Sequence, residues 1–306
     1  MNKKITIKVP ATSANCGPGF DSLGFACNLY NYFTFELIDE GLVLEVFGEG
    51  ENTLNASTEN LAFLSFFTIW DKIRKNKTGL KITMENNIPL SRGLGSSSTA
   101  IVAGLMAANG LTGDNFSKDE ILTMATNIEG HPDNVAPTIF GNFTISYLDE
   151  MTKIPKSIVI TPKNKIKFVA IVPNTPLSTK KAREVLPKDI SHEDAVFNVS
   201  RVSVLIASLL SGDYSNLSVG LEDKLHQPYR LPLINCSSLV IERSKELGAY
   251  NTTISGAGST LMVYLPIELD AKKVAENIVS YLKENNYDAK YFILELDSQG
   301  ATVLNQ

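Results

Sequence analysis

The 306-residue sequence predicts a soluble globular protein of the α+β class with two domains. The chain is longer than one compact domain usually is, which favours two domains that share a cleft. Hydrophobic residues make up 43% and charged residues 20%, as in ordinary globular proteins. Strand and helix patterns follow each other without an internal repeat, and a stretch rich in lysine and proline divides them. We therefore expect domains at residues 1–163 and 164–306.

The first half of the chain shows patterns of both kinds. Apolar patterns predict strands over residues 5–9, 32–38, 42–47, 81–85 and 142–147. Helical spacing predicts helices over residues 60–75, 96–109 and 117–130. The turn at Asp39-Glu-Gly41 predicts that the strands on either side form an antiparallel hairpin. Ser117 and Glu120 have the spacing of a capping box, which places the start of the third helix.

The second half continues in the same order. Strands are expected over residues 168–172, 261–265 and 291–296. Helices are expected over residues 194–210, 232–247 and 270–284. This arrangement favours a second α+β unit.

Charge and cysteine content exclude several classes of protein. The net charge is −5, and the 28 basic and 33 acidic residues are interspersed, which argues against a nucleic-acid partner. Cys16, Cys27 and Cys236 form no CxxC pair and predict neither a disulfide framework nor a zinc site. The first residues contain no apolar signal core, and apolar stretches such as 61–70 are shorter than the roughly 18 residues of a membrane span. We expect a cytoplasmic protein without a membrane partner.

The strongest chemical signal is a glycine-serine segment between a predicted strand and a predicted helix. Small residues let backbone N–H groups approach an anion, and the helix that follows adds the positive end of its dipole. No Walker A motif and no GxGxxG fingerprint occurs in the chain. A flexible loop capped by Ser96 or Ser97 would share this pattern, so other segments must decide. The expected phosphate-binding residues are Pro89, Leu90, Ser91, Arg92, Gly93, Leu94, Gly95, Ser96, Ser97 and Ser98.

Three segments together resemble the GHMP family of galactokinase, homoserine kinase, mevalonate kinase and phosphomevalonate kinase. Residues 10–21 (PATSANCGPGFD) resemble the first family motif, residues 89–98 the phosphate loop and residues 255–260 (SGAGST) the third motif. The resemblance covers nearly the whole chain. It implies the two-domain GHMP kinase fold, with an N-terminal half like ribosomal protein S5 domain 2 and a ferredoxin-like C-terminal half. Cys16, Ser98 and Ser259 depart from the usual leucine, alanine and proline.

Within the family, the first motif with Asn15 and Asp21 resembles the homoserine kinase form, as do residues 129–137 and 178–183. This resemblance implies ATP-dependent phosphorylation of the side-chain hydroxyl of L-homoserine, a step toward threonine. Two alternatives stay open: a kinase of the same family that acts on another alcohol, such as mevalonate or a sugar, and a non-catalytic nucleotide-binding regulator. Whether the protein is a homodimer also stays open.

The resemblance implies roles for the nucleotide-binding residues. Glu129 and a loop serine are similar to the family's Mg²⁺ ligands, and carboxylate and hydroxyl oxygens suit this ion. Ser97 is the expected serine, with Ser98 as the alternative. Asn60 and Leu61 are expected near the adenine of ATP.

The resemblance also implies how the amino acid is held. Asp21 and Asn15 would bind its ammonium group, and Arg183 and Arg230 its carboxylate, because acidic groups and guanidinium forks suit these charges. The remaining expected substrate contacts are His131, Asn134, Thr179, Gly256 and Gly258. The expected catalytic residues are Glu129, His131, Asp133 and Asn134.

Asp133 has two roles open to it. It is either a general base, as an aspartate near this point is in mevalonate kinase, or a turn residue that follows Pro132. His192 and His226 are expected to be structural or surface residues.

Overall fold

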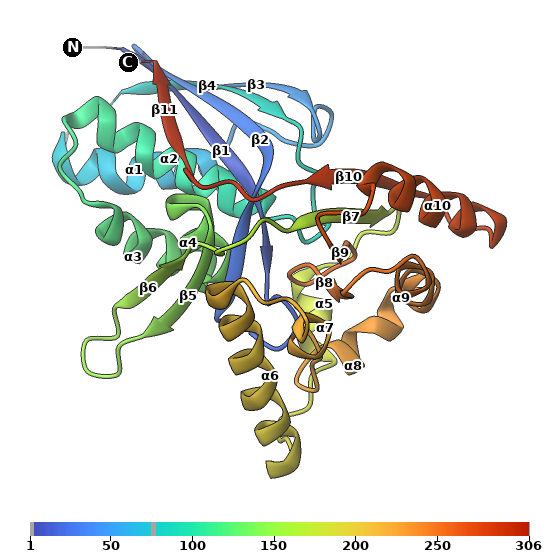
Figure 1. Cartoon of the computed structure of the whole chain (residues 1–306). Helices are drawn as coiled ribbons and strands as arrows, with labels where there is room; N and C mark the ends of the chain where they lie inside the picture. Colours follow the sequence, from blue (N-terminus) through green and yellow to red (C-terminus); the bar gives the residue numbers. More distant parts are fainter. Residues whose placement is uncertain (1–2, 75–77, 306) are drawn as a thin grey trace.

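The computed structural model describes residues 3–74 and 78–305, which form two β-sheets with helices packed on them (Figure 1). The first sheet has the order β11-β1-β2-β4-β3, and β2 also pairs with β5, which pairs with β6. Its strands are β1 (Lys4–Ala14), β2 (Leu23–Ile38), β3 (Leu42–Gly48), β4 (Gly79–Asn86), β5 (Phe143–Leu148), β6 (Pro155–Ile160) and β11 (Thr302–Asn305). All the strands predicted for the first half are present.

The predicted hairpin of β2 and β3 was wrong. β4 lies between these two strands, antiparallel to β2 and parallel to β3. The turn at residues 39–41 therefore connects two strands that are not adjacent in the sheet, and β4 lies between them. An alternating apolar pattern identifies a strand but does not identify its neighbour in the sheet. The backbone N–H and C=O groups of a strand can form hydrogen bonds with any strand that lies beside it.

Four helices belong to the first half: α1 (Leu61–Ile73), α2 (Ser96–Thr112), α3 (Lys118–Glu129) and α4 (Pro132–Phe140). Figure 1 shows α1, α2 and α3 gathered on one side of the first sheet, and their apolar side chains form a buried cluster with those of the sheet, including Phe35, Phe66 and Ile101. The capping box at α3 is confirmed, since Ser117 and Glu120 each accept a hydrogen bond from the other's backbone N–H.

Helix α4 was not predicted. It begins at Pro132, a favourable first helical residue because the missing N–H has no partner at this position anyway. It also contains Pro137, and the two prolines close together are typical of a turn. Burial of eight of its nine residues stabilises the helix in spite of this sequence. This matters for the site, since α4 carries Asp133 and Asn134.

The second sheet has the order β10-β7-β9-β8. Its strands are β7 (Lys167–Pro173), β8 (Asn251–Ile254), β9 (Leu261–Leu265) and β10 (Ala289–Leu294). The helices of this half are α5 (Thr179–Glu184), α6 (His192–Ser211), α7 (Leu217–Gly220), α8 (Gln227–Arg230), the 3₁₀ helix Leu231–Leu233, α9 (Ser237–Glu246) and α10 (Ala271–Glu284). The helix predicted from residue 232 begins later, because Pro232 lies in the 3₁₀ turn.

Helix α6 is long and apolar enough, by length and composition, to cross a membrane. Its contacts show another use for this apolar character. Leu205 and Leu209 belong to a buried cluster with residues of both sheets, including Phe25, Phe143 and Phe168. Its buried polar residue Asn198 donates hydrogen bonds to Pro18 O and Asp223 Oδ1. α6 is therefore a partly buried helix that packs its apolar residues into this cluster.

The end of the chain returns to its beginning. β11 pairs antiparallel with β1, with Ile7 opposite Val303 and Lys8 opposite Thr302, so the two ends lie side by side in Figure 1. The expected division at residues 163 and 164 stays a prediction.

Candidate active site

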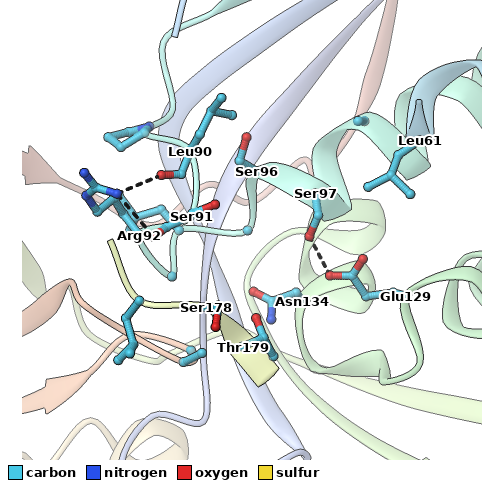
Figure 2. A pocket seen from close by; sticks show the side chains of 18 of the residues that line it. Leu61, Leu90, Ser91, Arg92, Ser96, Ser97, Glu129, Asn134, Ser178 and Thr179 are labelled. Atoms are coloured by element: carbon cyan, nitrogen blue, oxygen red, sulfur yellow. Dashed lines mark hydrogen bonds between the residues drawn. The ribbon is translucent and has the colours of Figure 1, made fainter. Parts of the chain in front are cut away.

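A cavity of about 540 Å³ lies at the N-terminus of α2, between side chains of both halves of the chain. All the predicted site residues except Ser98 line it: Asn15, Asp21, Asn60, Leu61, Pro89, Leu90, Ser91, Arg92, Gly93, Leu94, Gly95, Ser96, Ser97, Glu129, His131, Asp133, Asn134, Thr179, Arg183, Arg230, Gly256 and Gly258. Figure 2 shows Ser97 and Glu129 on one side of this cavity and Ser178 and Thr179 on another. The fold thus brings together residues that are far apart in the sequence.

The glycine-serine segment forms a cradle that a phosphate group would fit. Gly95 is the N-cap of α2 in the left-handed conformation, with φ of 71°, and no side chain caps this end among the described residues. The N–H groups of the first turn are therefore available to an anion. Ser255 Oγ donates to Gly93 O at 2.7 Å, so the loop that carries the third motif holds the cradle in place.

Arg92 does not point a free guanidinium at this cradle. Its Nε donates to Pro173 O at 3.2 Å and its Nη2 to Asn174 O at 2.8 Å. Its Nη1 contacts the carbonyl oxygens of Leu90 and Ser91, as Figure 2 shows. Arg92 therefore fastens the loop to the second half of the chain.

Two serine hydroxyls converge on one carboxylate oxygen. Ser97 Oγ donates to Glu129 Oε1 at 2.7 Å, and Ser98 Oγ donates to the same atom at 3.1 Å. Ser97 is exposed to the cavity, whereas Ser98 is fully buried. A carboxylate and a hydroxyl on a cavity wall are hard oxygen donors, and Mg²⁺ takes one or two such ligands when it also binds phosphates. These residues fit the predicted ion.

The start of α4 presents a connected polar group to the cavity. His131 Nδ1 is hydrogen-bonded to Asp133 Oδ1, and Asn134 Nδ2 also donates to this oxygen, at 3.4 Å. Asn134 Oδ1 accepts a hydrogen bond from Thr12 Oγ1 at 2.8 Å. Burial lowers the pKa of His131, but the hydrogen bond and the charge of Asp133, with the charge of Glu129, raise it above its ordinary value overall.

Asp21 and Arg183 are paired with each other. Both guanidinium Nη atoms of Arg183 donate to the Asp21 carboxylate at 2.9 Å, a bidentate geometry. Asn15 is buried, and its Nδ2 donates to Gly256 O at 2.7 Å while its Oδ1 accepts from Asp21 N at 3.0 Å. The residues predicted to bind opposite ends of one amino acid are thus adjacent on the cavity wall.

Arg230 is buried, with 2% of its surface exposed, yet it forms no ion pair with a carboxylate of the described residues. Its Nε donates to Ala182 O at 2.9 Å, and its Nη1 lies 3.4 Å from both Gly256 O and His226 Nδ1. Burial lowers the pKa of Arg230, and the nearby charge of Arg183 lowers it further. A buried cation on a cavity wall without a carboxylate partner favours an anionic guest.

Part of the cavity wall is apolar. Its lining includes the side chains of Leu54, Leu61, Met84 and Leu90. Apolar side chains of this kind suit a flat aromatic ligand. Asn60 is the N-cap of α1, and its side chain accepts a hydrogen bond from Ala62 N at 3.1 Å. Its role in the fold is therefore defined, and adenine contact remains a prediction for Asn60 and Leu61.

Some residues of the site were missed from the sequence. Thr12 lies within a segment that was recognised, but nothing singled out its hydroxyl. Phe20 and His226 pack against the arginines, and Asp223 supports them from a loop with no motif of its own. Phe20 lies within the recognised segment 10–21, but its contact with His226 arises only through the fold.

The phosphate cradle lies beside the carboxylate of Glu129, and the polar part of the cavity wall has room for a small acceptor molecule. Together these features define a small-molecule kinase. The profile of the GHMP kinases N terminal domain matches residues 63–142, which include the cradle and Glu129. The fold agrees, since mevalonate kinase of L. major, 16% identical, superimposes with a TM-score of 0.70 over 96% of this chain and 95% of that one.

Full-length relatives narrow this class. The homoserine kinase of Clostridium botulinum (strain Alaska E43 / Type E3) is 44% identical over 303 residues, and that of Clostridium beijerinckii is 43% identical over 301 residues, with 98% of each chain covered in both cases. The crystal structure of homoserine kinase from Cytophaga hutchinsonii superimposes with a TM-score of 0.89 at 27% identity, over 99% of this chain and 98% of that one. The chain belongs to the homoserine kinase family.

Proposed function

We propose that this protein transfers the γ-phosphoryl group of ATP to the side-chain hydroxyl of L-homoserine, a step of threonine biosynthesis that takes place in the cytoplasm. The observation that carries this proposal is Arg230, a buried guanidinium on the cavity wall with no carboxylate of the described residues bound to it. The α-carboxylate of homoserine would supply the anion that Arg230 lacks. An uncharged sugar would leave this charge unpaired, at a cost that works against its binding.

In the proposed reaction the hydroxyl oxygen of homoserine forms a bond with the γ-phosphorus. The bond from this phosphorus to the β,γ-bridging oxygen breaks, and ADP leaves with that electron pair. The hydroxyl proton passes to the transferred phosphoryl group or to solvent. Such a transfer depends on alignment and charge neutralisation more than on covalent chemistry.

We assign Ser97 and Glu129 as the residues that would hold Mg²⁺, because both line the cavity and Ser98 is buried behind them. A bound Mg²⁺ would neutralise charge on the β- and γ-phosphates. The N–H groups at the start of α2 would hold phosphate oxygens. Asn134, fixed by Thr12, would contact the acceptor hydroxyl.

For Asp133 we propose a positioning role. Its Oδ1 already accepts hydrogen bonds from His131 and Asn134, and 2% of the residue is exposed. Asparagine keeps an acceptor for His131, so Asp133→Asn is expected to lower kcat by less than roughly 10-fold. A general base would lose roughly 10²–10⁴-fold. The measurement is kcat at saturating homoserine and MgATP, and a fall of the larger size would contradict the positioning role.

The proposed function is tested by measuring ADP release with purified protein, MgATP and one acceptor at a time. L-Homoserine is expected to give the highest kcat/KM, above L-serine, mevalonate and galactose. A higher value for mevalonate or galactose would overturn the substrate assignment and leave a kinase of the same class. If no acceptor releases ADP at any concentration while MgATP still binds, the protein is a nucleotide-binding regulator instead.

A further inference from the structure

We propose that His226 is a positioning residue that sets the direction of the Arg230 guanidinium, and through it the preference of the enzyme for an acceptor with a carboxylate. This inference rests on the proposed function, because it takes the carboxylate of the acceptor to be the partner of Arg230. It assigns a role to a histidine that is fully buried and does not line the cavity.

His226 joins two parts of the cavity wall. Its Nε2 lies 2.9 Å from Gly17 O, in the loop that connects Asn15 with Asp21. Its Nδ1 lies 3.4 Å from Arg230 Nη1. One imidazole thus contacts both the loop with the acidic group and the arginine, and it fixes the separation between them.

The hydrogen-bond partners of His226 determine its tautomer. Nε2 faces two oxygen acceptors, Gly17 O at 2.9 Å and Asp223 Oδ2 at 3.5 Å, so the proton of the neutral ring belongs on Nε2. Nδ1 then carries a lone pair and accepts from Arg230. Burial lowers the pKa of His226, which keeps the ring neutral. A protonated ring would turn an N–H toward the guanidinium and repel it.

Asp223 holds the histidine in this orientation. Its carboxylate accepts backbone hydrogen bonds from Leu225 at 3.0 Å, His226 at 2.9 Å and Gln227 at 2.7 Å, and one from Asn198 Nδ2 at 2.9 Å. These bonds fix the turn that leads into α8, which carries Arg230 four residues after His226. The backbone of both residues is therefore set by the same buried carboxylate.

Phe20 completes the arrangement from the other side. Its ring stacks on the imidazole of His226 with centroids 5.2 Å apart, and the Arg230 guanidinium lies 5.0 Å from its centroid. The Arg183 guanidinium lies 5.8 Å from the same ring. The aromatic ring thus restricts lateral movement of Arg230, whereas His226 Nδ1 is the side-chain acceptor that faces Nη1, beside the backbone oxygen of Gly256 at the same distance.

Two substitutions separate the two hydrogen bonds of His226. In His226→Gln the side-chain amide reaches the position of Nε2 and keeps the bond to Gly17, but no acceptor remains at Nδ1. In His226→Asn the amide oxygen takes the position of Nδ1 and keeps the acceptor for Arg230, while the bond to Gly17 is lost. The comparison therefore isolates the contact with the guanidinium.

The experiment compares kcat/KM for L-homoserine with that for 3-aminopropan-1-ol, which is homoserine without its carboxylate. In His226→Gln we expect the homoserine value to fall by roughly 10-fold or more, through KM, and the 3-aminopropan-1-ol value to stay within about 2-fold. In His226→Asn the ratio of the two values should stay near that of the wild type. KM for ATP should be unchanged in both variants.

The kcat/KM values for the two acceptors are measured on one preparation of each variant. Partial unfolding lowers both values by the same factor, so their ratio does not change. His192→Gln, a substitution of the same kind at an exposed histidine, is the matched control and should leave the ratio unchanged. Equal losses for both acceptors in His226→Gln, or an unchanged ratio there, would overturn the inference. If the wild type phosphorylates neither acceptor, the proposed function fails instead, so the two failures are distinguishable.

Discussion

Replacing Gly95 by alanine is expected to lower kcat/KM for ATP by at least roughly 100-fold, because a small displacement of groups that hold reacting atoms costs about this much. A Cβ at this residue would lie 2.0 Å from Thr12 Oγ1 and 3.3 Å from Asn134 Oδ1, and φ is +71°. Thr12 and the cradle must therefore move apart. That movement breaks the hydrogen bond from Thr12 to Asn134 and shifts the first turn of α2.

The other end of the same helix provides a matched control. Gly113 also has a positive φ, 106°, but nothing lies within 4 Å of an added Cβ. Gly113→Ala should lower the free energy of unfolding by about 1–2 kcal/mol, from backbone strain alone, and leave kcat/KM for ATP near the wild-type value. Steady-state kinetics and urea unfolding of both variants provide the test. Wild-type kinetics in Gly95→Ala would show that the cradle does not require this close approach.

Glu129→Gln is expected to lower kcat by at least roughly 100-fold, and to raise the Mg²⁺ concentration for half-maximal activity by about 10- to 100-fold. The amide keeps the size of the side chain but removes the negative charge, while Ser97 and Ser98 still find an oxygen acceptor. The loss therefore reports on charge at the ion rather than on packing. The measurement is ADP release as a function of Mg²⁺ at fixed ATP and homoserine.

Glu120→Gln serves as the control for this substitution. It lies in the first turn of the same helix, α3, and glutamine preserves the capping box. This variant should have the Mg²⁺ dependence of the wild type. If Glu129→Gln also has the Mg²⁺ dependence of the wild type, Glu129 is not a ligand of the ion, and its carboxylate serves only to hold the two serines.

Most strands and helices could be predicted from sequence because their apolar patterns are local. The failures have physical causes that lie outside a local window. β4 takes the place beside β2 because of packing that no turn residue specifies. β11 is four residues long and depends on β1 for its hydrogen bonds. Tertiary burial stabilises α4 although Pro137 lies inside it, where proline is unfavourable.

In the candidate site too, residues within local motifs could be predicted from the sequence, whereas contacts made through the fold could not. Motifs located Asn15, Glu129 and Gly95, which the fold brings to one cavity, although their roles toward substrate and ion stay predictions. Sequence could not show that Asp21 pairs with Arg183, since ion pairs depend on distance in space. It could not find a role for His226 either, because a single histidine in a turn outside any motif has no distinguishing pattern.

The pairing of β11 with β1 has a consequence for synthesis of the protein. On the ribosome, β1 emerges first, but the strand that completes its hydrogen bonds is translated about 300 residues later. At the usual 5–20 residues per second this interval is on the order of 15–60 s. During this time one edge of β1 is open to water or to a neighbouring nascent chain. Completion of the first sheet therefore waits for the translation of β11, and chaperones have this interval in which to protect that edge.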